Sequence, residues 1–152
     1  MNLTARPPLV LFGAFDRHNF GDLLFPHLLT AMLPGHAFEM RGLAERDLRA
    51  FGGHEVRSLA ERGSVQAQHL IHVGGELLTC SAWQTAVMLL DPAGAAVAIS
   101  HRDTDILAAA DWAARQLGTS RAMPYVVGRD ALAASGRLIF NAVGGVEWAG
   151  LS

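Results

Sequence analysis

A polar loop near the N-terminus carries the residues best suited to chemistry. It spans residues 16–22, directly after an apolar run. The carboxylate of Asp22 could act as a general base that takes a proton from a hydroxyl group. The side-chain amide of Asn19 can hydrogen-bond a hydroxyl, and His18 and Arg17 can contact a phosphate or a sugar. The loop therefore points to recognition of a hydroxyl-bearing or anionic ligand.

Two residues of this loop also have purely structural interpretations. Asn19 can form an Asx-turn. Asp22 can cap the helix that the following apolar spacing predicts over about residues 22–33. Gly21, between them, is a position at which a ligand can approach the backbone closely. At the level of sequence, the structural and the functional roles of Asn19 and Asp22 both stay open.

Two further glycine turns follow apolar runs. Gly74 and Gly75 come directly after residues 68–73, and a second Gly-Gly pair follows residues 138–143. If these runs are parallel strands, both turns and the 16–22 loop open on one edge of the sheet, where ligands bind in such folds. Glu76, the next residue, can stabilise a helix start through the helix dipole or accept hydrogen bonds from sugar hydroxyls. We therefore expect a site at this edge.

The elements that position these loops follow from the pattern of apolar residues. Strands alternate with helical stretches, which indicates an α/β domain with a mainly parallel sheet of about five strands and helices on both faces. Two stretches stay undecided: residues 43–51 could form a helix or a turn, and residues 95–100 could form a strand or a helix. The expected strands are 9–15, 36–41, 54–59, 68–73, 125–127 and 138–143, and the expected helices are 22–33, 77–90 and 104–117.

Composition narrows the function classes. The 152 residues fit one domain, and a formal net charge of −2 gives no electrostatic case for nucleic-acid binding. All twelve cationic residues are arginine, so a P-loop lysine or a Schiff-base lysine is excluded. The single cysteine, Cys80, fits a reducing compartment. We expect a cytoplasmic protein, because no signal peptide and no apolar run long enough to span a bilayer is present.

Metal and cofactor sites are not expected. His69 and His72 lie three apart on a predicted strand and so point to opposite faces, and His72, which shares a face with Leu70, is expected to be a core histidine. No H-E-x-x-H, Cys/His cluster or G-x-G-x-x-G motif occurs.

Three segments resemble landmarks of the polysaccharide pyruvyl transferase family. Residues 12–22 resemble its opening motif, a strand and a glycine followed by Asn19-x-Gly21-Asp22 at the first helix. The segments His72-Val-Gly-Gly-Glu-Leu-Leu78 and Asn141-Ala-Val-Gly-Gly145 resemble its second and third landmarks, each a strand that ends in Gly-Gly. The three occur in the family's order and roughly span the chain. Glu76 departs from the pattern, since glutamate is not fixed at that position.

The resemblance implies a fold and an activity. Family members are similar to two-domain GT-B glycosyltransferases, with two Rossmann-like halves, and transfer a pyruvyl group from phosphoenolpyruvate to two hydroxyls of a sugar. Residues 1–152 would form a single Rossmann-like, three-layer domain, the N-terminal, acceptor-side half, in exopolysaccharide biosynthesis. Asp22 would be catalytic, and the substrate-binding residues would be His18, Asn19, Gly21, Gly74, Gly75 and Glu76.

The partners follow from the same resemblance. They would be a glycan or lipid-linked sugar acceptor and a C-terminal domain that binds phosphoenolpyruvate, since nothing in this chain matches the family's residues for that donor. Only nine residues follow the strand over 138–143, which also predicts a longer protein. We expect this chain alone to be inactive, to bind no phosphoenolpyruvate, and to expose an apolar patch that could also support a homo-oligomer. A nucleotide-sugar glycosyltransferase half and a non-catalytic binding domain are the alternatives.

Overall fold

The computed structural model describes residues 7–59, 67–102 and 106–145. Its strands are β1 (Leu9–Phe12), β2 (Phe38–Gly42), β3 (Arg46–Asp47), β4 (Glu55–Ser58), β5 (Ala67–Val73) and β6 (Leu132–Asn141). Its helices are α1 (Phe20–Met32), α2 (Ala82–Met88), α3 (Pro92–Arg102) and α4 (Ile106–Leu117), and single 3₁₀ turns cover Arg49–Phe51 and Arg129–Ala131. The chain therefore has an α/β fold, as predicted.

The six strands form one sheet in the order β3-β4-β2-β1-β5-β6. Every pairing is parallel except the one between β3 and β4. Val10 of β1 lies opposite Glu39 of β2 on one side and Leu70 of β5 on the other. The carboxyl ends of β1, β5 and β6 consequently lie on one edge, which confirms the prediction for these three strands. The sheet is mixed because of β3, which lies in the stretch 43–51, expected to be a helix or a turn.

Alternation along the strands creates two apolar faces. Leu11 and Ile71 point to the face that α1 covers, where Leu23 and Leu29 of that helix join them. Each fully buried side chain of this kind contributes about 1.5–3 kcal/mol relative to an exposed one. Val10, Phe12 and Leu70 point to the opposite face and pack against Tyr125 and Val127.

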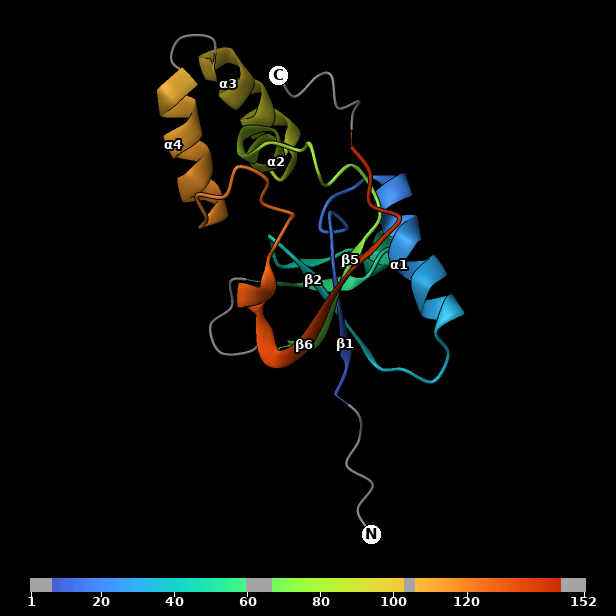
Figure 1. Ribbon diagram of the computed structural model, residues 1–152. Helices are drawn as coiled ribbons and strands as arrows, with labels where there is room; N and C mark the ends of the chain where they lie inside the picture. The colour runs from blue at the N-terminus through green and yellow to red at the C-terminus, as the bar shows by residue number, and fades with distance from the viewer. Residues whose placement is uncertain (1–6, 60–66, 103–105, 146–152) are drawn as a thin grey trace.

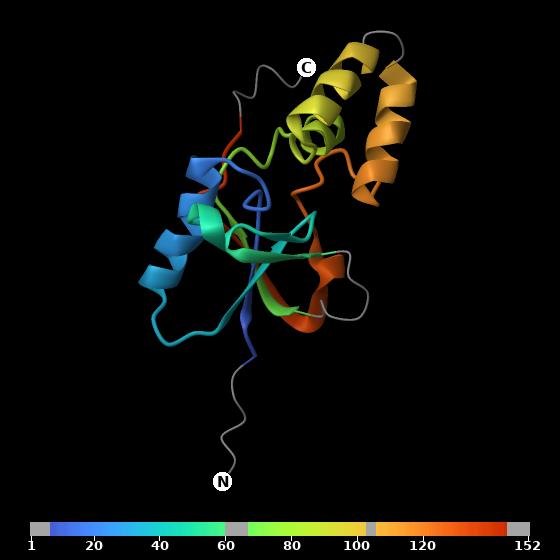
Figure 2. The ribbon, with the colours of Figure 1, turned by 180° about the vertical axis from the view of Figure 1, so that it is seen from behind.

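The helices are distributed differently from the expectation. Among the described residues, the face opposite α1 is covered by the segment 124–131, whose buried Tyr125 and Val127 form no strand, contrary to prediction. Helices α2, α3 and α4 gather beyond the carboxyl edge of the sheet (Figures 1 and 2). Helices α2 and α4 share a small core of Ala86, Ala113 and Leu117.

Two further differences from the predicted elements concern the residues at which helices α2 and α3 begin. Helix α2 begins at Ala82 rather than near residue 77, because Ser81 and Gln84 form a capping box there. The undecided stretch 95–100 belongs to α3, which begins at Pro92, a residue favoured in the first helical position. Asp91 precedes it and accepts a hydrogen bond from the amide of Gly94 at 2.7 Å.

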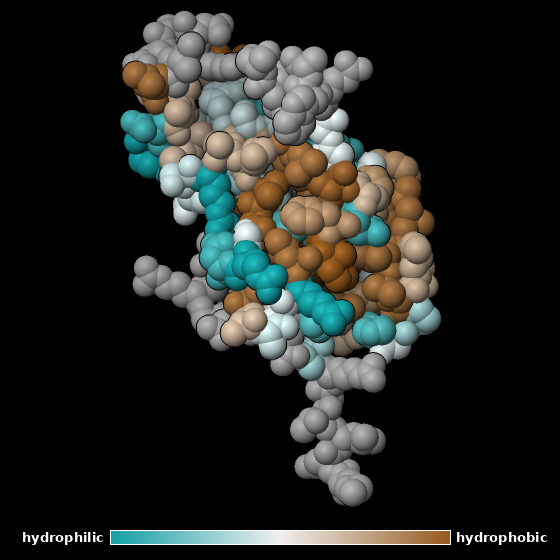
Figure 3. All heavy atoms as spheres, viewed as in Figure 1, coloured by the Kyte–Doolittle hydropathy of each residue, from teal (hydrophilic) through white to brown (hydrophobic). Residues whose placement is uncertain are grey.

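An exposed apolar surface runs along α1. Phe20, Leu24, Leu28 and Met32 recur every fourth residue and are exposed, and Ile139 of the neighbouring sheet is also exposed. Figure 3 shows brown side chains over α1 and β6. In the part of the chain that the structure describes, no helix has the length and apolarity needed to cross a bilayer.

Candidate functional site

The order of the strands reverses between β1 and β5, and a cavity lies at the carboxyl edge near this point. Open α/β sheets bind ligands at such switch points. The cavity has a volume of about 760 Å³. It is lined by Arg17, His18, Asn19, Phe20, Arg46, Met88, Leu90, Asp91 and Pro92. The loop after β1 thus supplies most of its polar wall, including the predicted residues His18 and Asn19.

The first helix is capped by Asn19 and not by Asp22. The backbone of Asn19 is extended, and its side-chain oxygen accepts a hydrogen bond from the amide of Gly21 at 3.1 Å. The prediction that Asp22 caps this helix is therefore wrong: the helix begins two residues earlier, so Asp22 already lies in its first turn. Because the Asn19 oxygen serves the cap, the side-chain NH₂ group is the part available to a ligand.

Asp22 forms an ion pair with Arg17. Its Oδ2 atom lies 2.8 Å from Nη2 and 3.0 Å from Nε of Arg17, and both side chains are about nine-tenths buried. Burial by itself would lower the pKa of Arg17, but the Asp22 carboxylate, together with Tyr125 and Cys80, outweighs it, and the pKa is raised. Arg17 is therefore a permanent cation in the cavity wall, whereas Asp22 is not among the residues that line the cavity.

The two glycines after β5 accommodate helix α1. A Cβ atom on Gly74 would lie 2.1 Å from the ring of Phe25, and one on Gly75 would lie 2.5 Å from Oδ1 of Asp22. The φ angles of +62° and +75° also favour glycine. The prediction that these glycines give a ligand access to the backbone is not supported, since side chains of α1 fill the space beside them.

The third turn lies beside the second. The amide of Gly144 donates to the carbonyl of Gly75 at 2.9 Å, and the amide of Leu78 donates to the carbonyl of Gly144 at 3.2 Å. Glu76 pairs with Gly144 in a parallel bridge and accepts a hydrogen bond from Thr79 Oγ1 at 2.7 Å. Glu76 is exposed but lies in this extended turn and not at a helix start. The three loops do converge, and close contacts within the chain account for Gly74, Gly75 and Gly145.

Sequence reasoning missed Asp16, which is fully buried beneath the same loop. Its carboxylate accepts hydrogen bonds from Tyr125 Oη at 2.6 Å and from the amides of Leu43 and Ala44 at 2.7 and 2.9 Å. Burial raises the pKa of Asp16, and the hydrogen bonds oppose this shift. Burial and the neighbouring carboxylate also raise the pKa of Tyr125. The sequence did hold one signal for Asp16: it comes directly after an apolar run that predicts a buried strand, where polar side chains often serve a site.

His72 is a core histidine, as predicted. Its side chain is fully buried, its ring stacks on Phe140 at a centroid distance of 4.4 Å, and its Nε2 accepts a hydrogen bond from the amide of Val127 at 3.0 Å. Burial lowers the pKa of His72 to about 4, so the imidazole is neutral at physiological pH. The hydrogen bond between His72 and Val127 connects the segment 124–131 to β5.

The cavity at the sheet edge offers recognition groups rather than a nucleophile. Arg46 donates to the carbonyl of Leu89, and Arg17 is held by Asp22, so both guanidinium groups are fixed in position. His18 and Asn19 are exposed beside them. Within the described ranges, no group of three His, Cys, Asp or Glu residues could hold a metal ion. The arrangement suits a ligand that carries hydroxyl or anionic groups.

Comparisons with known proteins gave no match for this chain among protein-family models, curated proteins or solved structures.

Proposed function

We propose that this chain is the N-terminal, acceptor-side domain of a polysaccharide pyruvyl transferase, with a Rossmann-like, GT-B-like architecture and a cytoplasmic location. The whole enzyme would move a pyruvyl group from phosphoenolpyruvate to a sugar of a bacterial glycan. The observation that carries the proposal is the cavity at the switch point of the sheet. Its polar wall contains Arg17, His18 and Asn19, which belong to the segment that resembles the family's opening motif.

Each of these residues has a role in acceptor binding. The Asn19 amide NH₂ and the His18 imidazole hydrogen-bond sugar hydroxyls at the mouth of the cavity. Arg17 offers a fixed positive charge to an anionic group of the acceptor. Asp22 is a positioning residue that holds Arg17, because its carboxylate faces Arg17 and Gly75. A base role for Asp22 would require that carboxylate to leave Arg17.

The proposal can be tested on the 152-residue chain by nuclear magnetic resonance. We expect methyl β-D-galactopyranoside, methyl α-D-glucopyranoside or methyl α-D-mannopyranoside to shift the backbone amides of residues 17–20. Phosphoenolpyruvate and UDP-glucose should leave these amides unshifted, since the donor would bind to another domain. The variant His18→Ala should weaken binding of the sugar about 2- to 10-fold, the effect of one lost hydrogen bond.

The matched control is His36→Ala, an exposed histidine that does not line the cavity. This variant should bind the sugar like the unaltered chain. Shifts caused by UDP-glucose at residues 17–20 would favour a nucleotide-sugar glycosyltransferase, and binding of phosphoenolpyruvate would show that the donor site had been misplaced. If none of the three glycosides binds, the acceptor-side assignment is wrong.

A further inference from the structure

A second cavity lies between helices α3 and α4, and no residue of the loop after β1 lines it. Its volume is about 850 Å³, within the range of about 300–1,000 Å³ typical of small-molecule sites. The facing helix surfaces carry small residues, Ala93, Gly94 and Ala98 on α3 and Ala108 and Ala109 on α4. Such residues cannot fill the gap between two helices, so the space is open to a ligand.

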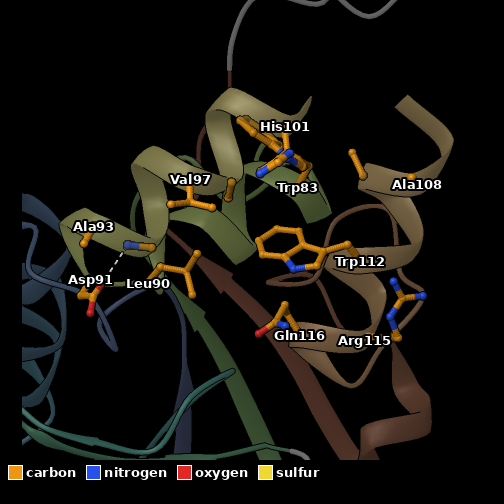
Figure 4. A pocket seen from close by; sticks show the side chains of 13 residues that line it. Trp83, Leu90, Asp91, Ala93, Val97, His101, Ala108, Trp112, Arg115 and Gln116 are labelled. Atoms are coloured by element: carbon orange, nitrogen blue, oxygen red, sulfur yellow. Dashed lines mark hydrogen bonds between the residues drawn. The ribbon is translucent and has the colours of Figure 1, made fainter. Parts of the chain in front are cut away.

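Aromatic and aliphatic side chains form the interior of this cavity. The indole of Trp112 projects from α4 into the space between the helices, and Val97 of α3 lies across from it (Figure 4). Trp83 of α2 lies at the back. These surfaces favour an apolar body, since moving it out of water is the main source of affinity in such sites.

A cation lies at the rim of the same cavity. Arg115 is exposed on α4, one turn from Trp112, and among the described residues its guanidinium group has no hydrogen-bond or ion-pair partner. The carboxylate at the far end, Asp91, is directed to the amide of Gly94, which it contacts at 2.7 Å. The rim near Trp112 therefore presents a positive charge that a ligand anion can reach.

We infer that this cavity binds a small apolar carboxylate, whose hydrocarbon body lies between α3 and α4 and whose carboxylate pairs with Arg115. The guanidinium group matches a carboxylate in a bidentate geometry, which sets the orientation of the ligand. The inference is independent of the acceptor site, although Leu90 and Asp91 belong to the walls of both cavities.

Calorimetry with two probes of the same shape tests the inference. The probes are 4-phenylbutyrate and the uncharged 4-phenylbutanol, both added to the full 152-residue chain. We expect 4-phenylbutyrate to bind with a dissociation constant of about 1 mM or lower, as ligands of this size do in a good site. The variant Arg115→Gln should weaken its binding by about 10-fold, equivalent to one charged hydrogen-bonded pair, and leave binding of the alcohol unchanged.

A second variant tests the place of the hydrocarbon body. Ala109→Leu puts a larger side chain into the cavity and should weaken both probes at least several-fold. Ala110→Leu is the matched control, because Ala110 is exposed on the same helix and does not line the cavity. Leucine is a strong helix former, and circular dichroism should show both variants folded. Absence of 4-phenylbutyrate binding, or equal binding by Arg115→Gln and the unaltered chain, would overturn the inference.

Discussion

The carboxylate of Asp22 occupies the space that a side chain on Gly75 would need. A Cβ atom on Gly75 would lie 2.5 Å from Oδ1 of Asp22, while Oδ2 of the same carboxylate lies 2.8 Å from Arg17. This one carboxylate therefore connects the first turn of α1, the loop after β1 and the turn after β5. The close contact requires glycine at position 75, and the ion pair keeps Arg17 in the wall of the cavity.

Substituting Gly75 with alanine should destabilise the protein through both the backbone and this contact. The positive φ angle of +75° is strained for alanine, and the new methyl group would push Asp22 away from the turn. We expect a loss of about 2–4 kcal/mol in the free energy of unfolding, measured in urea. Gly52→Ala is the control, with a φ angle of +77° and no atom near its Cβ. If both variants lose the same stability, the contact with Asp22 contributes nothing.

The variant Asp22→Asn distinguishes an ion-pair role of Asp22 from a helix-capping role. Asparagine caps a helix as well as aspartate does, so a capping role predicts nearly unchanged stability. The ion pair predicts a loss on the order of 3 kcal/mol, because Arg17 is left almost buried without its partner. Thermal and urea unfolding distinguish the two results. Asp47→Asn, which breaks an exposed pair with Arg49, should change stability very little.

Removing the hydroxyl of Tyr125 should weaken the protein most where Asp16 is ionised. Tyr125→Phe takes one of three hydrogen bonds from the buried carboxylate, which costs about 1–3 kcal/mol at neutral pH. That hydrogen bond favours the charged form, and burial raises the pKa of Asp16, so the loss should shrink as the pH falls and Asp16 is protonated. Thr85→Val, which removes a buried hydroxyl that contacts Cys80 and no carboxylate, should show no such pH dependence.

Acid should destabilise the fold through His72. Its pKa is about 4 in the folded protein and about 6.5 in the unfolded chain, so the unfolded chain binds more protons between these values. Stability should therefore fall as the pH drops from about 6.5 to 4. In His72→Gln the side-chain oxygen can still accept a hydrogen bond from the amide of Val127. The midpoint of unfolding of this variant should change less with pH over this window. The control His36→Gln, at an exposed histidine, should keep the pH dependence of the unaltered chain. If His72→Gln also keeps it, His72 is not the cause of the acid destabilisation.

The sequence by itself determined where the main elements and the ligand-facing loops would lie. Apolar runs bounded by glycine turns predicted β5 at Gln68–Val73, and amphipathic spacing predicted α4, whose described start is Ile106. The parallel arrangement of β1, β5 and β6 then brought the three loops to one edge, as expected. These features depend on local propensity and on alternation between apolar and polar residues, both of which can be recognised in a single segment.

Only the tertiary structure decided which polar and aromatic groups meet. Asp22 pairs with Arg17 instead of capping α1, and Asp16 finds Tyr125 across 109 positions of sequence. The segment around Tyr125 forms no strand, because burial against β1 and β5, and not β-propensity, holds it in place. A carboxylate or an indole has no preference for a particular distant residue until packing excludes water from it, so its partner depends on how the rest of the chain surrounds it.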